Sequence, residues 1–293
     1  MPTIENQFLR VCVDAHGAEL CSIFDKTRNH EVIWNADPAY WQRHAPVLFP
    51  FVGKVNKGAY RYKGISYSMG QHGFARDMDF TLESADEQSI TFCLTSNEET
   101  LQKYPFPFEL RITHTLDGHT LKVTWEVRNP SLAPMYFSIG GHPAFNVPAD
   151  REQHRNDYYV QFKGSDTYSY ILIDPEEEAA NPDQPHLLET DGGILPVTDH
   201  LFDNDALIFD NGQVQQASIL YPDRTPYVTL SCKGFPSFGL WSKPHSDAPY
   251  ICLEPWIGRV DNIGFDGELP DKYGEMELAG GDVFTASYTI EVH

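Results

Sequence analysis

The chain has 293 residues, of which 42 are acidic and 21 basic, so its formal net charge at pH 7 is −21. A field of that sign repels polyanions, and we expect no nucleic-acid partner. Five cysteines, an odd number without a CxxC pair, lie in apolar stretches, which predicts buried free thiols in a reducing compartment and a cytoplasmic location.

No segment of the sequence favours secretion or membrane insertion. The N-terminal residues lack the basic stretch followed by an apolar one that a secretory signal contains. The most apolar run, residues 45–52, contains Pro46 and Pro50 and is much shorter than the roughly 20 residues of a membrane-spanning helix. We therefore expect no membrane contact. Composition is even along the chain and no linker interrupts it, which predicts one domain over residues 1–293.

Short segments in which apolar and polar residues alternate predict β-strands along most of the chain. In chain order they cover residues 8–14, 18–24, 89–94, 108–116, 120–128, 158–162, 218–221, 227–232 and 286–292. The clearest is 120–128, where Leu121, Val123, Trp125 and Val127 fall on one face.

Turn and helix signals complete this outline. Lys-Gly at 63–64 and Asp-Gly at 117–118 predict hairpin turns, and Asn97 predicts the start of a short helix that ends before Pro105. Many strands, few helices, and 21 glycines and 21 prolines for turns predict an all-β protein. The expected architecture is a large antiparallel β-sandwich, with a β-barrel as the alternative. The absence of a repeat argues against a propeller or a β-helix.

The acidic, proline-containing stretch 174–193 shows little apolar periodicity. It predicts a long solvated surface loop in preference to a functional lid.

Three segments framed by glycine or proline each place a titratable side chain in apolar surroundings. They are residues 71–77 (QHGFARD), 140–146 (GGHPAFN) and 253–259 (LEPWIGR). Glycine beside a histidine lets the backbone and a ligand approach closely. An unpaired charge on Glu254, at the end of an apolar run, would be costly to bury. His72, His142 and Glu254 are therefore candidate functional residues.

Taken together, these segments resemble the aldose 1-epimerase (galactose mutarotase-like) superfamily, whose fold is a many-stranded β-sandwich. The resemblance runs from APVLFPFVGK near residue 50 to EPWIG near residue 255. It implies that the whole chain is one domain of this type. It also implies that Glu254 is the general base, His142 the general acid, and His72 a second histidine near the sugar ring oxygen. An acidic residue that binds sugar hydroxyls should be Asp205, with Asp203 as the alternative.

The chemistry that the resemblance implies suits these residue types. Interconversion of α and β anomers removes the proton of the C1 hydroxyl while the ring oxygen is protonated, and ring closure on the other face reverses both transfers. One base and one acid suffice, each worth roughly 10² to 10⁴ in rate. Histidine suits the acid because its pKa lies near neutrality. We therefore expect an isomerase without a cofactor or metal, whose partner is a small-molecule sugar and which acts as a monomer or homodimer.

Substrate identity is less closely defined by the sequence. The segment QRHAPVLFPFVGKVNKG differs from the arginine-bearing segment of the better-known galactose mutarotases and looks closer to the hexose-6-phosphate mutarotase subgroup. Residues 40–80 carry six basic and two acidic side chains, a local excess of positive charge. Arg43, Lys54 and Arg76 could therefore contact a phosphate, or could be ordinary surface charges. Trp256, beside Glu254, is a candidate sugar-stacking residue.

Rival interpretations explain fewer of these features. A glycosidase would use paired carboxylates such as Asp203, Asp205 and Glu254 but would not need two glycine-framed histidines. A non-catalytic carbohydrate-binding protein remains an alternative, which an anomer-exchange assay separates from an enzyme. No HxH, HExxH or CxxC spacing indicates a metal site, and His114 and His119 are expected to be exposed hairpin residues.

Overall fold

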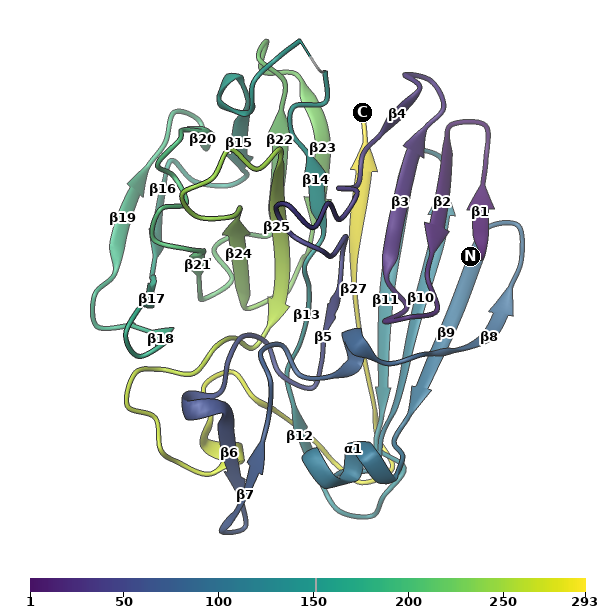
Figure 1. Ribbon diagram of the computed structural model, residues 1–293, viewed down its shortest axis with the longest axis vertical. Helices are drawn as coiled ribbons and strands as arrows, with labels where there is room; N and C mark the ends of the chain where they lie inside the picture. The colour runs from purple at the N-terminus through teal and green to yellow at the C-terminus, as the bar shows by residue number, and fades with distance from the viewer. Residues whose placement is uncertain (151) are drawn as a thin grey trace.

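Most of the segments with alternating polarity form antiparallel strands in the computed structural model, which describes residues 1–150 and 152–293. The large antiparallel β architecture predicted from the sequence is confirmed (Figure 1). No helix within the described residues is long and apolar enough to cross a membrane.

The largest sheet has nine strands in the order β20-β15-β22-β23-β27-β11-β10-β9-β8 and is called the large sheet. Its strands are β8 (Thr81–Ala85), β9 (Ser89–Thr95), β10 (Glu109–Asp117), β11 (Thr120–Arg128), β15 (Tyr159–Phe162), β20 (Ile194–Pro196), β22 (Gln216–Leu220), β23 (Pro226–Ser231) and β27 (Val283–Val292). The C-terminal strand β27 lies between β23 and β11, so it joins strands from both halves of the chain (Figure 1).

A second sheet of six strands, called the small sheet, runs β21-β24-β25-β13-β5, and β14 also pairs with β25. Its strands are β5 (Val47–Leu48), β13 (Ile139–Gly141), β14 (Ala144–Asn146), β21 (Leu207–Phe209), β24 (Ser237–Trp241) and β25 (Tyr250–Ile257).

The remaining elements are short. A four-stranded sheet contains β1 (Thr3–Glu5), β2 (Leu9–Val13), β3 (Leu20–Asp25) and β4 (His30–Glu31). Strand pairs are formed by β6 (Ala59–Tyr62) with β7 (Ile65–Ser68), β12 (Met135–Phe137) with β26 (Met276–Leu278), β16 (Thr167–Tyr170) with β19 (His186–Glu189), and β17 (Ile173–Asp174) with β18 (Ala179–Ala180). The helical segments are α1 (Glu98–Lys103) and the 3₁₀ segments Asn56–Gly58, Ala75–Asp77, Arg155–Asp157 and Leu269–Asp271.

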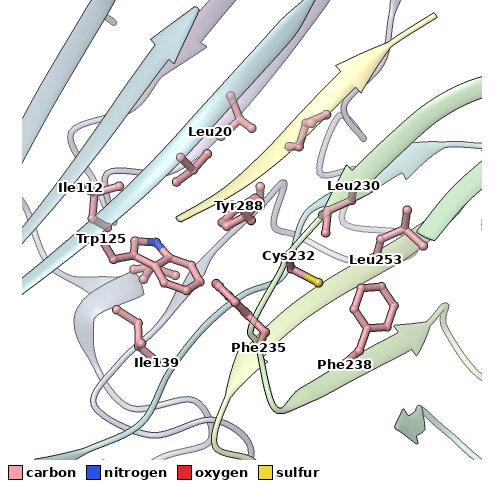
Figure 2. Packing of buried hydrophobic residues seen from close by; sticks show 14 of the residues in the cluster. Leu20, Ile112, Trp125, Ile139, Leu230, Cys232, Phe235, Phe238, Leu253 and Tyr288 are labelled. Carbon is pink, nitrogen blue, oxygen red and sulfur yellow. The ribbon is translucent and has the colours of Figure 1, made fainter. Parts of the chain in front are cut away.

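The main core is formed by apolar side chains that the two sheets direct toward each other. Figure 2 shows Trp125 from β11 and Tyr288 from β27 of the large sheet, near Leu253 and Phe238 from β25 and β24 of the small sheet. Because side chains alternate across a strand, the residues next to Leu253 on β25 point to the opposite face. That outer face of the small sheet is where the candidate site lies.

The predicted turns and helix are confirmed. Strands β6 and β7 pair around Lys63-Gly64, and β10 and β11 pair around Asp117-Gly118. Asn97 caps α1, since its side chain accepts a hydrogen bond from the Thr100 backbone while the Thr100 hydroxyl accepts one from Asn97. Both bonds satisfy amide groups that a helix start leaves free.

The expectation that His114 is exposed is wrong. It lies on β10 between Ile112 and Leu116, on the face that packs into the core, and is 1% exposed. Burial lowers its pKa to about 4, because the charged ring would lose its hydration. His119 is half-buried and stacks on Phe8, with ring centroids 4.0 Å apart.

The cysteine prediction is confirmed in part. All five thiols are free, as expected, and Cys93, Cys232 and Cys252 are buried. Cys12 and Cys21 are only half-buried, because they lie on the partly exposed face of the four-stranded sheet.

Candidate active site

A cleft of about 960 Å³ opens on the outer face of the small sheet. Of the residues predicted from the sequence, those that line it are His72, His142, Glu254, Asp203, Asp205, Lys54, Arg76 and Trp256. Side chains from segments far apart in the chain thus converge at one place. A smaller hollow of about 520 Å³, beside the β6–β7 hairpin and α1, contains none of the predicted residues.

Glu254 lies on the cleft floor because it alternates with Leu253 on β25. Its side chain is almost fully buried, and its Oε2 atom has no hydrogen-bond partner within the described residues. Burial raises the pKa of Glu254 well above its usual value, and the negative charge of Asp205 adds to that rise. The neighbouring Trp256 side chain acts in the opposite direction. The carboxyl group is therefore a better proton acceptor than an exposed glutamate.

His142 follows the two glycines of β13 and places its ring beside Glu254. The distance from His142 Nε2 to Glu254 Oε2 is 3.3 Å. Trp41 stacks on the imidazole at a centroid distance of 4.6 Å, and Trp241 meets it edge-on at 5.4 Å. Burial lowers the pKa of His142 to about 3, and the charges of Arg76 and Arg43 act in the same direction.

Burial therefore favours the uncharged form of the His142–Glu254 pair, in which Glu254 carries the shared proton. The general-acid role expected of His142 requires a protonated ring, which burial disfavours in the free protein. The physical reason is the cost of removing two charges from water. In an apolar site this cost exceeds the attraction between the two charges, unless further hydrogen bonds stabilise them. The pair still holds one proton donor and one proton acceptor in contact.

His72 lies in the turn after β7 with a backbone φ of +65°. The Gly53 backbone N–H donates to His72 Nδ1 at 3.0 Å, and the His72 N–H donates to the Gly53 carbonyl at 2.7 Å. Since Nδ1 accepts, the proton of the neutral ring is assigned to Nε2. Burial, with Arg76, lowers the pKa of His72 well below its usual value. His72 is thus a neutral hydrogen-bond donor at the cleft.

The two acidic candidates differ in their partners. Both carboxylate oxygens of Asp203 have a histidine partner. His200 Nδ1 lies 2.8 Å from Oδ2, and His245 Nδ1 lies 3.3 Å from Oδ1. Asp205, with φ +69°, accepts a hydrogen bond from the Ala206 backbone and lies close enough to Glu254 to raise its pKa. These contacts favour Asp205 as the residue with free acceptor capacity toward a ligand.

Trp256 lies on β25 two residues beyond Glu254. An ideal Cβ atom at Gly140 would lie 2.7 Å from Trp256 Cδ1, and one at Gly239 would lie 2.5 Å from Trp256 Cζ2. The indole thus lies against glycines on both neighbouring strands, β13 and β24. Trp41 and Trp241, which the sequence did not distinguish from core residues, also line the cleft.

Each of the predicted basic residues has a partner within the protein. Lys54 forms an ion pair with Glu178. Arg76 donates to the Gln71 carbonyl at 2.7 Å, and burial lowers its pKa to about 10. Arg43 is not part of the cleft lining, and its guanidinium pairs with Asp77 at 2.8 Å. The structure therefore brings Lys54 and Arg76, but not Arg43, to the cleft.

The expectation of a solvated loop at 174–193 holds for most of its residues, which are exposed, but part of the segment also forms a wall of the cleft. Asp174, Glu178 and His186 line the cleft. The segment is fixed in place where the Ala180 N–H donates to the Asp261 carbonyl at 2.8 Å and the Ile263 N–H donates to the Ala180 carbonyl at 2.9 Å. In the sequence, the two adjacent small apolar residues Ala179 and Ala180 were the local sign that this part of the segment is buried. The residues that hold them in place are distant in the chain.

Comparison with known proteins defines the class. The profile of the family described as aldose 1-epimerase matches residues 2–259, and the chain belongs to that family. It is 31% identical to the chromosomal protein LacX of Lactococcus lactis over 296 residues, covering 99% of this chain and 98% of LacX.

Two solved structures share the fold closely. A galactose mutarotase related enzyme from Lactobacillus acidophilus is 37% identical with a TM-score of 0.94, covering 100% of this chain and 97% of that one. A galactose mutarotase-like protein from Lactobacillus casei is 33% identical with a TM-score of 0.91, covering 100% of both chains.

Proposed function

We propose that the protein is an aldose 1-epimerase, a mutarotase that interconverts the α and β anomers of a hexose. One observation carries this proposal: His142 Nε2 and Glu254 Oε2 lie 3.3 Å apart on the floor of an open cleft. Mutarotation moves protons at two oxygens bonded to the same carbon, the C1 hydroxyl and the ring oxygen. An acid and a base that act on them must therefore be neighbours.

The reaction then balances without any other reagent. Glu254, as carboxylate, takes the proton of the C1 hydroxyl while His142 gives its proton to the ring oxygen, and the bond from C1 to the ring oxygen breaks. The open-chain aldehyde rotates about its C1–C2 bond. The ring oxygen attacks the other carbonyl face, returning its proton to His142, and the new C1 oxygen takes its proton from Glu254. No electron changes hands, so no redox cofactor is required.

Substrate binding prepares the pair for these roles. The reaction leaves the number of protons on the pair unchanged, and burial favours the form of the free protein in which Glu254 holds that proton. A sugar hydroxyl that donates to the carboxylate stabilises its charged form and favours transfer of the proton to His142. His72, with its proton on Nε2, is available to donate to the substrate, and Asp205 is available to accept from its hydroxyls.

Replacing Glu254 with glutamine tests the proposal, because it keeps the size of the side chain and removes the proton acceptor. We expect kcat to fall by about 10² or more. Mutarotation is followed by polarimetry on freshly dissolved α-glucose and α-galactose. Glu126→Gln, on β11 of the large sheet, is the matched control and should retain full activity. Near-wild-type turnover in Glu254→Gln would reject its role as the base, and sugar binding without faster exchange in the wild type would indicate a carbohydrate-binding protein.

A hexose 6-phosphate is the second candidate substrate, because Arg76 and Lys54 line the cleft. Against it, Lys54 already pairs with Glu178, and the carboxylates Asp174 and Asp205 also line the cleft. Carboxylates repel phosphate at short range unless free cations outnumber them. The charges of the cleft therefore favour a neutral hexose.

A further inference from the structure

A third side chain that can bind a metal ion, Cys252, lies close to the His142–Glu254 pair. Cys252 and Glu254 are two residues apart on β25 and therefore share its outer face. The Cys252 sulfur, a ring nitrogen of His142 and a carboxylate oxygen of Glu254 all lie within 4.8 Å of one another. No other group of three such residues is this close in the part of the chain that the structure describes.

These donors are available to a cation. Glu254 Oε2 is buried and lacks a hydrogen-bond partner within residues 1–150 and 152–293, and His142 Nε2 lies 3.3 Å from it. Both side chains are more than nine-tenths buried yet line the cleft, so an ion can reach them from solvent. Cys252 is fully buried behind them, paired with Ala144 on β14 and Trp241 on β24.

The spacing suits tetrahedral zinc. Ligands at about 2.0 Å from a tetrahedral ion are about 3.3 Å apart, the observed separation of His142 Nε2 and Glu254 Oε2. A sulfur about 2.3 Å from the ion would lie about 3.5 Å from each of these two atoms. Since Cys252 Sγ already lies within 4.8 Å of both side chains' ligand atoms, it would need to move toward them by no more than about 1.3 Å. Three protein ligands leave the fourth position open to the cleft.

Charge balance favours such an ion as well. A thiolate and a carboxylate together neutralise a divalent cation, so the loaded cluster would carry no net charge in its apolar surroundings. Binding forms bonds from the metal to sulfur, oxygen and nitrogen and releases the thiol and carboxyl protons to water. Asp203 and Asp205 at the same cleft would attract the incoming cation.

We propose that Cys252, His142 and Glu254 form a binding site for a thiophilic divalent cation such as Zn²⁺, and that the bound ion inhibits the enzyme. The inhibition rests on the proposed epimerase function, whereas the binding does not. When His142 and Glu254 bind the metal, the lone pairs that would accept a proton are occupied. Neither side chain can then exchange a proton with a sugar. The ion competes with catalysis and takes no part in it.

Cobalt binding tests the site independently of activity. Protein cleared of metal with EDTA and then dialysed is titrated with Co²⁺, and the expected result is one ion per chain with a thiolate-to-cobalt charge-transfer band and the intense visible bands of a tetrahedral complex. Zn²⁺ should displace the cobalt. Cys252→Ser and Cys252→Ala should lose the charge-transfer band and bind Zn²⁺ at least tenfold more weakly by calorimetry. Cys232→Ser, a buried cysteine outside the cluster, should behave like the wild type.

Activity is then compared with and without Zn²⁺ in each variant. We expect zinc to inhibit the wild type and Cys232→Ser at a concentration at least tenfold below that needed for Cys252→Ser. Absence of the charge-transfer band in the wild type overturns the proposal, even if both Cys252 variants fail to fold. A cobalt band in a protein without mutarotase activity would leave the metal site standing and refute the proposed function instead.

Discussion

Replacing Gly73 with alanine should distort the turn that holds His72. Gly73 has φ +72°, and an added Cβ would lie 2.2 Å from the backbone oxygen of Phe49. The left-handed backbone costs an alanine roughly 1–2 kcal/mol, and overpacking against a backbone that cannot rotate away costs roughly 1–3 kcal/mol more. Alanine also lowers the conformational entropy of the unfolded chain, which stabilises the folded state by about 0.4–1 kcal/mol. We expect the free energy of unfolding to fall by roughly 2–4 kcal/mol.

Gly64 provides a matched control for the contact. Its φ is +74°, but a Cβ atom there would meet nothing within 4 Å. Gly64→Ala should therefore cost only about 1 kcal/mol, the backbone cost less the gain in the unfolded state. Urea unfolding of both variants at one pH measures the difference, which isolates the clash with Phe49.

The same substitution should affect catalysis. The Phe74 and Ala75 N–H groups donate to the Phe49 carbonyl, so a displaced Phe49 moves the segment that carries His72. A shift of this kind in a positioning group can lower kcat by up to about 100-fold. Gly64→Ala should leave kcat unchanged. If the two variants lose equal stability and equal activity, the close approach of Gly73 to Phe49 has no energetic consequence and the reasoning is refuted.

Three further predictions concern pH, substrate and metal. Burial lowers the pKa of His114 to about 4, whereas the unfolded chain binds this proton near pH 6.5. The free energy of unfolding should therefore fall by roughly 3 kcal/mol as the pH decreases from about 6.5 to about 4, because only the unfolded state gains the proton. His114→Leu should flatten this part of the dependence of unfolding free energy on pH, and an unchanged slope would contradict the buried assignment. The kcat/KM of the wild type should be higher for glucose or galactose than for their 6-phosphates; a preference for the phosphates that Arg76→Ala or Arg43→Ala abolishes would instead establish phosphate recognition. Activity should survive EDTA, and a loss that added metal restores would place the protein among the metal-dependent enzymes.

Several features could be predicted from the sequence because they depend on neighbours in the chain. The alternation at 120–128 identifies a strand whatever it pairs with, and the structure has β11 over the same residues. Lys63-Gly64 forms its hairpin turn because the positive φ it needs is local, and Asn97 caps its helix through a residue only three positions away. His72, His142 and Glu254 could be named because glycine and proline frame them within a few residues.

Tertiary structure decided which faces are buried and which distant residues meet. His114 has the same local appearance as an exposed hairpin residue, and only the packing of β10 against the core makes it buried and neutral. The segment near Ala180 becomes a cleft wall through hydrogen bonds to Asp261 and Ile263, about 80 positions along the chain. Cys252 is an ordinary apolar-strand cysteine in the sequence, and its closeness to His142 follows from the pairing of β25 with β13 and β14. Strand pairing and burial are properties of the whole chain, since they depend on surfaces that meet only after folding.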